Sequence, residues 1–173
     1  MTAPYFVDAN VLLYAHDPSE PIKSPRAKAW LAHLWKERTG RISMQVLSEY
    51  YVNVTRKLKP GLPQEVAWED VTTYLTWNPY PVDEMLLRRA REIEQRYRLS
   101  WWDSMVVAAA QLQDCALLLT EDLQDGMVFG TVTVRSPFKL AVEEQVASYA
   151  GVPRPRSVHR PRGRPRKTAE IGA

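Results

Sequence analysis

Three acidic residues, each alone in a long uncharged and largely apolar stretch, constrain this chain more than any other feature. Burying a carboxylate among apolar side chains is costly unless it is paired with a cation or binds a metal. No Lys or Arg lies inside the same stretches, so the sequence predicts that the three carboxylates meet around a cation. They are Asp8 within residues 1–16, Glu49 within residues 42–55 and Asp103 within residues 99–113.

The sequence around each carboxylate predicts its place in the local structure. The apolar segment before Asp8 is typical of a short strand, which places Asp8 at the carboxyl end of that strand. Apolar residues around Glu49 recur at helical spacing, and Glu49 lies beside that buried stripe. Ser100 is positioned to cap an Ala-rich helix whose first turn contains Asp103.

A fourth acidic group follows the apolar run 116–119, again where a strand is expected to end. Ligands of parallel sheets collect outside the carboxyl ends of the strands. We therefore expect Asp8 and residues 120–122 to share a crevice that Glu49 and Asp103 approach on helices. Such carboxylates repel one another unless a divalent cation offsets their charge. An all-oxygen set suits Mg²⁺ or Mn²⁺ rather than zinc, and the chemistry that this implies is phosphodiester hydrolysis.

Strand-like and helix-like segments alternate along residues 1–150, which predicts one α/β domain of three layers, with a central parallel sheet flanked by helices. Helices are expected from Ser24 to about Glu37, over residues 63–76, and from a cap at Asp83 to about Tyr97. Cys115 is predicted to be a buried, inert thiol. The chain shows neither a membrane-spanning apolar run nor the features of a signal peptide, so we expect a cytoplasmic protein without a membrane partner.

Four short segments occur in a characteristic order: Phe6-Val-Asp-Ala-Asn-Val-Leu-Leu-Tyr, Ser48-Glu-Tyr, Trp102-Asp-Ser-Met-Val-Val-Ala-Ala-Ala and Leu119-Thr-Glu-Asp. Together they resemble the motifs of PIN-domain ribonucleases, and within that family they are most similar to the VapC-type toxins of type II toxin–antitoxin systems. The resemblance implies a PIN fold, with a central parallel sheet flanked by helices, and Mg²⁺-dependent cleavage of single-stranded RNA. It also implies a cognate antitoxin that blocks the site, and a homodimer.

The resemblance also assigns a role to each acidic residue. Asp8 and Asp103 would be the principal metal ligands, and Glu49 would be a ligand or would orient a metal-bound water. Asp122 would be the fourth acid, supported by a hydrogen bond from Thr120. Glu121 and Asp125 are close enough in sequence to compete with Asp122 for this last role.

Each carboxylate also has a purely structural interpretation. Asp8 would cap a strand-to-helix turn, Asp103 would complement a helix dipole, and Glu49 would pair with Arg41 or Arg56. A solvated turn would explain Asp122. All four explanations must hold together for the structural account to stand, so we favour the shared site. A separate group of arginines, at 88, 91 and 98, is expected on one solvated helix face or at an RNA contact.

The composition changes at residues 151–173, which are rich in Pro and Arg and are predicted to be disordered. Residues 1–151 contain 16 of the 23 basic and 19 of the 20 acidic residues, so the basic character of the chain belongs to this tail. Segment 161–167 resembles an AT-hook, which implies binding in the minor groove of A·T-rich DNA. The alternative is a polycation that binds any phosphate backbone. The residues concerned are Arg162, Gly163, Arg164, Pro165, Arg166 and Lys167.

These observations predict a Mg²⁺-dependent endoribonuclease that acts on single-stranded or structured RNA, is the toxin of a toxin–antitoxin pair and has a basic nucleic-acid-binding tail. Two alternatives stay open. One is a PIN nuclease that acts on DNA, or in RNA processing, without an antitoxin. The other is a catalytically silent nucleic-acid-binding module in which the carboxylates are structural.

Overall fold

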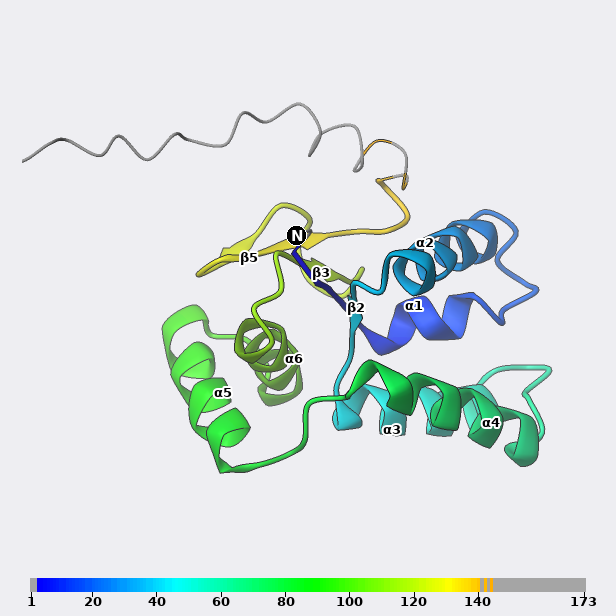
Figure 1. Cartoon of the computed structure of the whole chain (residues 1–173), viewed down its shortest axis with the longest axis horizontal. Helices are drawn as coiled ribbons and strands as arrows, with labels where there is room; N and C mark the ends of the chain where they lie inside the picture. The colour runs from blue at the N-terminus through cyan, green and yellow to red at the C-terminus, as the bar shows by residue number, and fades with distance from the viewer. Residues whose placement is uncertain (1–2, 141, 143, 145–173) are drawn as a thin grey trace, which may run out of the picture.

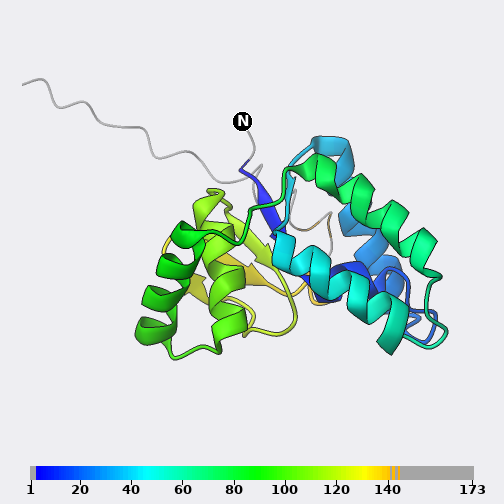
Figure 2. The ribbon, with the colours of Figure 1, turned by 90° about the horizontal axis from the view of Figure 1, so that it is seen from below.

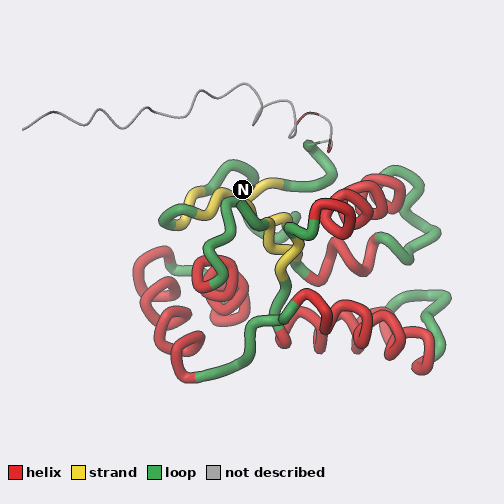
Figure 3. Tube along the Cα trace, viewed as in Figure 1, coloured by secondary structure: helices red, strands yellow, loops and turns green. Residues whose placement is uncertain are grey.

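A five-stranded sheet in the order β2-β1-β3-β5-β4 forms the centre of the protein. The structure is a computed structural model that describes residues 3–140, 142 and 144. Strands β2, β1, β3 and β5 are parallel, and β4 pairs with β5 in the antiparallel direction. The strands, yellow in Figure 3, are β1 (Tyr5–Val7), β2 (Gly40–Arg41), β3 (Leu117–Leu119), β4 (Val128–Phe129) and β5 (Val132–Arg135).

Six α-helices surround this sheet in the described part of the chain (Figures 1 and 2). Helix α5 packs against α6, α1 packs against both α2 and α3, and α4 packs against α3. A π-helical turn (Asn53–Lys57) follows α3, and a 3-10 turn (Leu75–Trp77) follows α4. The helices are α1 (Ala9–Tyr14), α2 (Lys23–Glu37), α3 (Met44–Val52), α4 (Gln64–Tyr74), α5 (Glu84–Tyr97) and α6 (Trp101–Leu112).

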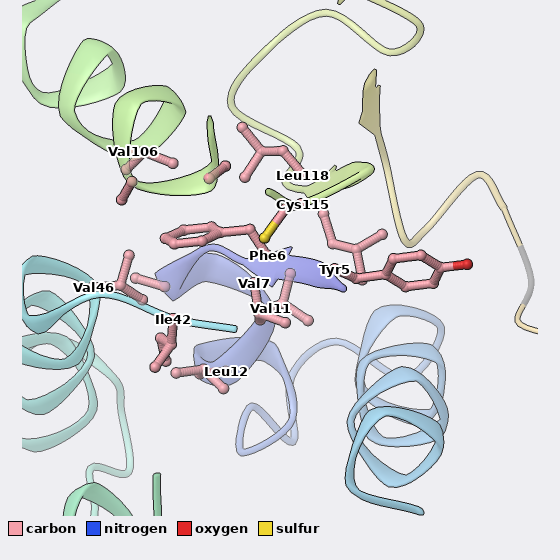
Figure 4. Close-up of a cluster of buried hydrophobic side chains, with 14 of the residues drawn as sticks. Tyr5, Phe6, Val7, Val11, Leu12, Ile42, Val46, Val106, Cys115 and Leu118 are labelled. Carbon is pink, nitrogen blue, oxygen red and sulfur yellow. The ribbon is translucent and has the colours of Figure 1, made fainter. Parts of the chain in front are cut away.

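Strand β1 is covered by helices on both faces. The Phe6 ring lies between Val46 of α3 and Val106 of α6 (Figure 4). The neighbouring Tyr5 ring meets Trp30 of α2 edge-on, with ring centroids 6.2 Å apart. Successive residues of a strand point to opposite faces, so α3 and α6 lie on one side of the sheet and α2 on the other. The predicted α/β fold, a central parallel sheet flanked by helices, is confirmed.

The register of β1 against β3 determines where the site forms. Val7 is paired with Leu119, and the Asp8 amide donates to the Leu119 carbonyl at 3.1 Å. The two strands therefore end together, and the next residue of each, Asp8 and Thr120, emerges at the same edge of the sheet. This is the arrangement that the sequence predicts.

Several local predictions are confirmed and others need correction. The Asp83 side chain caps α5 by accepting from the Leu86 amide at 2.8 Å. Cys115 is buried, and burial raises the pKa of its thiol to about 12, as expected of an inert cysteine. The predicted helix over 63–76 ends earlier, at Tyr74, because the chain tightens into the 3-10 turn. The β4–β5 hairpin was not predicted.

No helix in the described ranges is long and apolar enough to cross a membrane. The AT-hook-like segment and the rest of the tail lie outside the described residues, so their structure stays a prediction from sequence.

Candidate active site

Asp8 is a buried carboxylate that also caps a helix. It is the N-cap of α1, where its Oδ1 accepts from the Ala9 amide at 2.7 Å, and its Oδ2 accepts from the Thr120 hydroxyl at 2.7 Å. Only 6% of the residue is exposed, and no Lys or Arg in the described part of the chain forms an ion pair with it. The capping interpretation is therefore correct, but it does not explain why the residue is an uncompensated acid.

The environment of Asp8 favours its neutral form in the absence of a cation. Burial raises the pKa of the Asp8 carboxyl from 3.8 to about 7, and the charges of Asp122 and Glu49 add to that rise. The hydrogen bonds from Thr120 and Ala9 act in the opposite direction. Three of the four predicted acids therefore lie close enough to interact electrostatically, as expected for carboxylates gathered at one edge of a sheet.

The Thr120 hydroxyl connects the two strand ends. It donates to Asp8 and accepts from the Asn10 side-chain amide at 3.1 Å and from the Asp122 backbone amide at 3.1 Å. Asn10 Nδ2 also donates to Asp122 Oδ2 at 3.0 Å. Asp8, Asn10, Thr120 and Asp122 thus form one hydrogen-bonded network between α1 and the turn after β3.

The three acids of that turn have different partners. Glu121 forms an ion pair with Lys23 at 2.9 Å. Asp125 accepts from Arg135 at 3.2 Å and from the Ser136 amide at 2.8 Å. Asp122 is the acid that joins the network of Asp8, whereas the other two hold neighbouring elements in place. This geometry favours Asp122 as the fourth acid among the candidates that the sequence left open.

Glu49 lies on α3, half-buried, and is held by a glutamine one turn earlier. Gln45 Nε2 donates to Glu49 Oε1 at 2.9 Å and approaches the Trp102 carbonyl at 3.4 Å. Within the described ranges Glu49 forms no ion pair with Arg41 or Arg56, so that alternative is wrong. The bonds of Gln45 connect α3 to the first turn of α6.

Asp103 occupies the predicted position in the first turn of α6. The Ser100 hydroxyl accepts from the Asp103 amide at 3.1 Å and caps the helix, as the sequence indicates. The Asp103 side chain is partly exposed. Within the described residues, no hydrogen bond or ion pair joins its carboxylate to Asp8, Glu49 or Asp122, so the predicted meeting of Asp103 with the other acids is not seen.

Across the described residues, no group of three or more Asp, Glu, His or Cys side chains is close enough together to enclose a metal ion. The oxygen atoms that are present nevertheless suit a hard cation. Mg²⁺ typically keeps several waters and is bound through one or two carboxylates rather than by a complete protein cage. The buried Asn10 Oδ1 has no hydrogen-bond partner, which leaves an unused oxygen beside Asp8 and Asp122.

Residues 5–124 match the model of the PIN domain. The chain belongs to the PIN domain family. That segment contains the four predicted site acids, Asp8, Glu49, Asp103 and Asp122. No curated protein sequence matches the chain.

Two solved structures share this PIN fold at low sequence identity. VapC20 of Mycobacterium tuberculosis, described as a sarcin-ricin loop cleaving toxin, has 19% identity and a TM-score of 0.53 over 68% of this chain and 91% of its own. VapBC2 of Rickettsia felis, solved bound to a DNA fragment from its promoter, has 16% identity and a TM-score of 0.53 over 76% of this chain and 97% of its own. At these identities the similarity establishes the fold.

Sequence reasoning missed two polar residues of this PIN domain, Asn10 and Gln45. Each donates an amide hydrogen to one of the acids, Asn10 to Asp122 and Gln45 to Glu49. Asn10 lies in the same uncharged stretch as Asp8, and Gln45 precedes Glu49 by one helical turn. The signal that would have found both is a side-chain amide within about one helical turn of an isolated acid.

Proposed function

We propose that this PIN domain is a metal-dependent nuclease that hydrolyses phosphodiester bonds of single-stranded or structured RNA, and that it is the toxin of a toxin–antitoxin pair. The observation that carries the proposal is the network around Asp8. A buried carboxylate without a cationic partner, beside two further acids, is costly unless the site binds a cation. A metal-dependent nuclease would bind Mg²⁺ or Mn²⁺ at this site, and that ion would be the missing cation.

The residues of the site have distinct tasks in this proposal. Asp8 and Asp103 would hold the cation, with Asp122 and Glu49 as further ligands or as acceptors that orient water. When bound, a divalent cation lowers the pKa of a coordinated water and stabilises charge on the reacting phosphate. The hydrogen bonds from Asn10 to Asp122 and from Gln45 to Glu49 fix these two carboxylates before substrate arrives.

Thr120 positions the acids rather than taking part in the chemistry. Its hydroxyl has no exposed surface and is saturated by Asp8, Asn10 and the Asp122 amide. Because it bridges the ends of β1 and β3, it keeps Asp8 and the turn that contains Asp122 together.

The proposal includes a protein partner and self-association. An apolar hollow of about 320 Å³ lies between α3 and α4, and exposed apolar side chains surround it. Such a surface is typical of a protein interface, and we assign it to the antitoxin or to the second copy of a homodimer. Its lining includes Met44, Leu47, Tyr51, Val52, Trp68 and Leu75.

We further propose that residues 1–150 are the nuclease domain and that the basic tail, 151–173, binds nucleic acid. The support is compositional: the segment Arg162-Gly163-Arg164-Pro165 joins arginines to a glycine that lets the backbone approach a groove.

The test is a cleavage and binding panel with purified, antitoxin-free protein. It contains single-stranded RNA, structured RNA, single-stranded DNA, and A·T-rich and G·C-rich duplexes, each with Mg²⁺, Mn²⁺ or EDTA. We expect cleavage of RNA with either cation and none in EDTA. Metal-dependent cleavage of DNA alone would support the alternative PIN nuclease. Metal-independent binding without any cleavage would support the silent binding module, and a preference for the A·T-rich duplex would identify the tail as an AT-hook.

The turn after β3 contains a matched pair of variants. Asp122→Asn should lower RNA cleavage at least about tenfold, because it replaces a carboxylate in the network around Asp8 by an amide. Glu121→Gln should leave the cleavage rate within about twofold, since Glu121 forms a half-buried ion pair with Lys23 instead of joining the network of Asp8. Initial rates in Mg²⁺ would measure both. Loss of activity in Glu121→Gln with full activity in Asp122→Asn would reverse the assignment.

A further inference from the structure

A second hollow, of about 460 Å³, is lined by Glu49 and by other residues of α3 and α6. Glu49 itself lines it, and Asp103 directly follows its aromatic wall, Trp102. The lining residues are Gln45, Ser48, Glu49, Val82, Trp102 and Met105.

Trp102 is unusually exposed for its position. About 63% of its surface is accessible, although it lies in the first turn of the helix that contains Asp103. Its ring makes no ring contact or cation contact within the described residues, whereas Trp30, Trp35, Trp68 and Trp77 all contact other rings. Val82, which also lines the hollow, is 54% exposed. The hollow thus has an exposed aromatic side chain and an exposed apolar side chain in its lining.

Gln45 gives the hollow an unused hydrogen-bond acceptor. The residue is 8% exposed, and its Nε2 is committed to Glu49 and the Trp102 carbonyl. Its Oε1 is buried without a hydrogen-bond donor. A buried acceptor that lacks a donor costs free energy, and a ligand with an N–H group in this hollow would remove that cost.

We propose that this hollow binds one unpaired nucleobase of the substrate, next to the phosphate that is cleaved. The base stacks on Trp102 and donates an N–H to Gln45 Oε1. Each nucleobase has a flat π-face for stacking and ring or amino N–H groups, and aromatic stacking is how single-stranded nucleic acid is commonly held. The inference rests on the proposed nuclease function, since the neighbouring carboxylates are what place a phosphate here.

The binding site can be tested without cleavage. Single-stranded RNAs with the fluorescent base 2-aminopurine at each position in turn are titrated with full-length protein in EDTA, and cleavage of the same RNAs is measured in Mg²⁺. We expect strong quenching at one position next to the cleaved bond. Trp102→Ala should weaken RNA binding and raise KM by about 5- to 150-fold. Trp102→Phe should keep most of the affinity.

Two controls make the result specific. Met85→Ala removes another exposed apolar side chain, 59% accessible on α5, and should leave RNA affinity unchanged. An abasic nucleotide at the quenched position should weaken binding to the wild-type protein and have no further effect on Trp102→Ala, because the same contact is already lost.

The inference is overturned if Trp102→Ala binds RNA as tightly as wild type while wild type cleaves it. That result would leave the nuclease intact and make the hollow a protein-binding surface. It is also overturned if no abasic position affects wild-type binding, an outcome that does not depend on any variant. A protein that cleaves none of the RNAs contradicts the proposed function separately, because quenching and abasic effects are measured without cleavage.

Discussion

Asp8→Asn is expected to lower metal-dependent RNA cleavage by at least about 10³-fold, because electrostatic stabilisation by a bound cation contributes several kcal/mol to the reaction. The substitution keeps the size of the side chain and an oxygen that can accept from the Ala9 amide. It removes the negative charge at the centre of the network. Cleavage rates at saturating Mg²⁺, with RNA binding in EDTA measured alongside, would separate loss of chemistry from loss of substrate.

Asp114→Asn is the matched control for this change. Asp114 is exposed and has a positive φ of 54°, a backbone conformation that Asn also tolerates, and it precedes β3 at the end away from Thr120. It should retain full activity.

Asp103→Asn tests the role implied by the family. If Asp103→Asn retains activity while Asp8→Asn is inactive, then the cation is held by Asp8, Asp122 and Glu49 without Asp103.

The free energy of unfolding of the metal-free protein should fall as the pH rises from about 4 to about 7. In the unfolded chain Asp8 ionises near its ordinary pKa of 3.8, whereas in the folded protein burial raises its pKa to about 7. Between these values the folded state holds a proton that the unfolded state has released, so stability decreases with pH and becomes constant above about 7. The shift of about three pKa units corresponds to about 3–5 kcal/mol.

Urea denaturation in EDTA across this pH range would measure the effect. Asp8→Asn should lose the dependence that arises from Asp8, so that its stability exceeds that of wild type at pH 8 and not at pH 4. Asp114→Asn should keep the wild-type slope. An unchanged slope in Asp8→Asn would contradict the prediction.

The candidate acids could be chosen from sequence because three isolated carboxylates are a local signal, although the described residues contain no group of three close enough to enclose a metal ion. Asp8 follows an apolar strand and Thr120 follows another, and parallel strands place their carboxyl ends together, so the shared edge was expected before the register was known. The N-caps at Ser100 and Asp83 were predictable for the same reason, since each depends on residues within one helical turn.

The remaining features depend on contacts between residues far apart in sequence. Asn10 donates to Asp122 across 112 positions, and Gln45 approaches Trp102 across 57. No local pattern indicates which of several acids or aromatic residues will meet such a partner. The choice among Glu121, Asp122 and Asp125 was open for this reason, since it depends on Lys23 and Arg135 attracting two of them elsewhere.

Both outer strands of the sheet are very short. β2 and β4 contain two residues each, and they lie at the two ends of the strand order. A long exposed edge offers unpaired amides and carbonyls to another chain and promotes aggregation, whereas a two-residue edge provides almost no template. Assembly of this protein by continuous intermolecular β-sheet is therefore disfavoured, and high local concentrations during synthesis should not lead to amyloid-like stacking through the sheet edges.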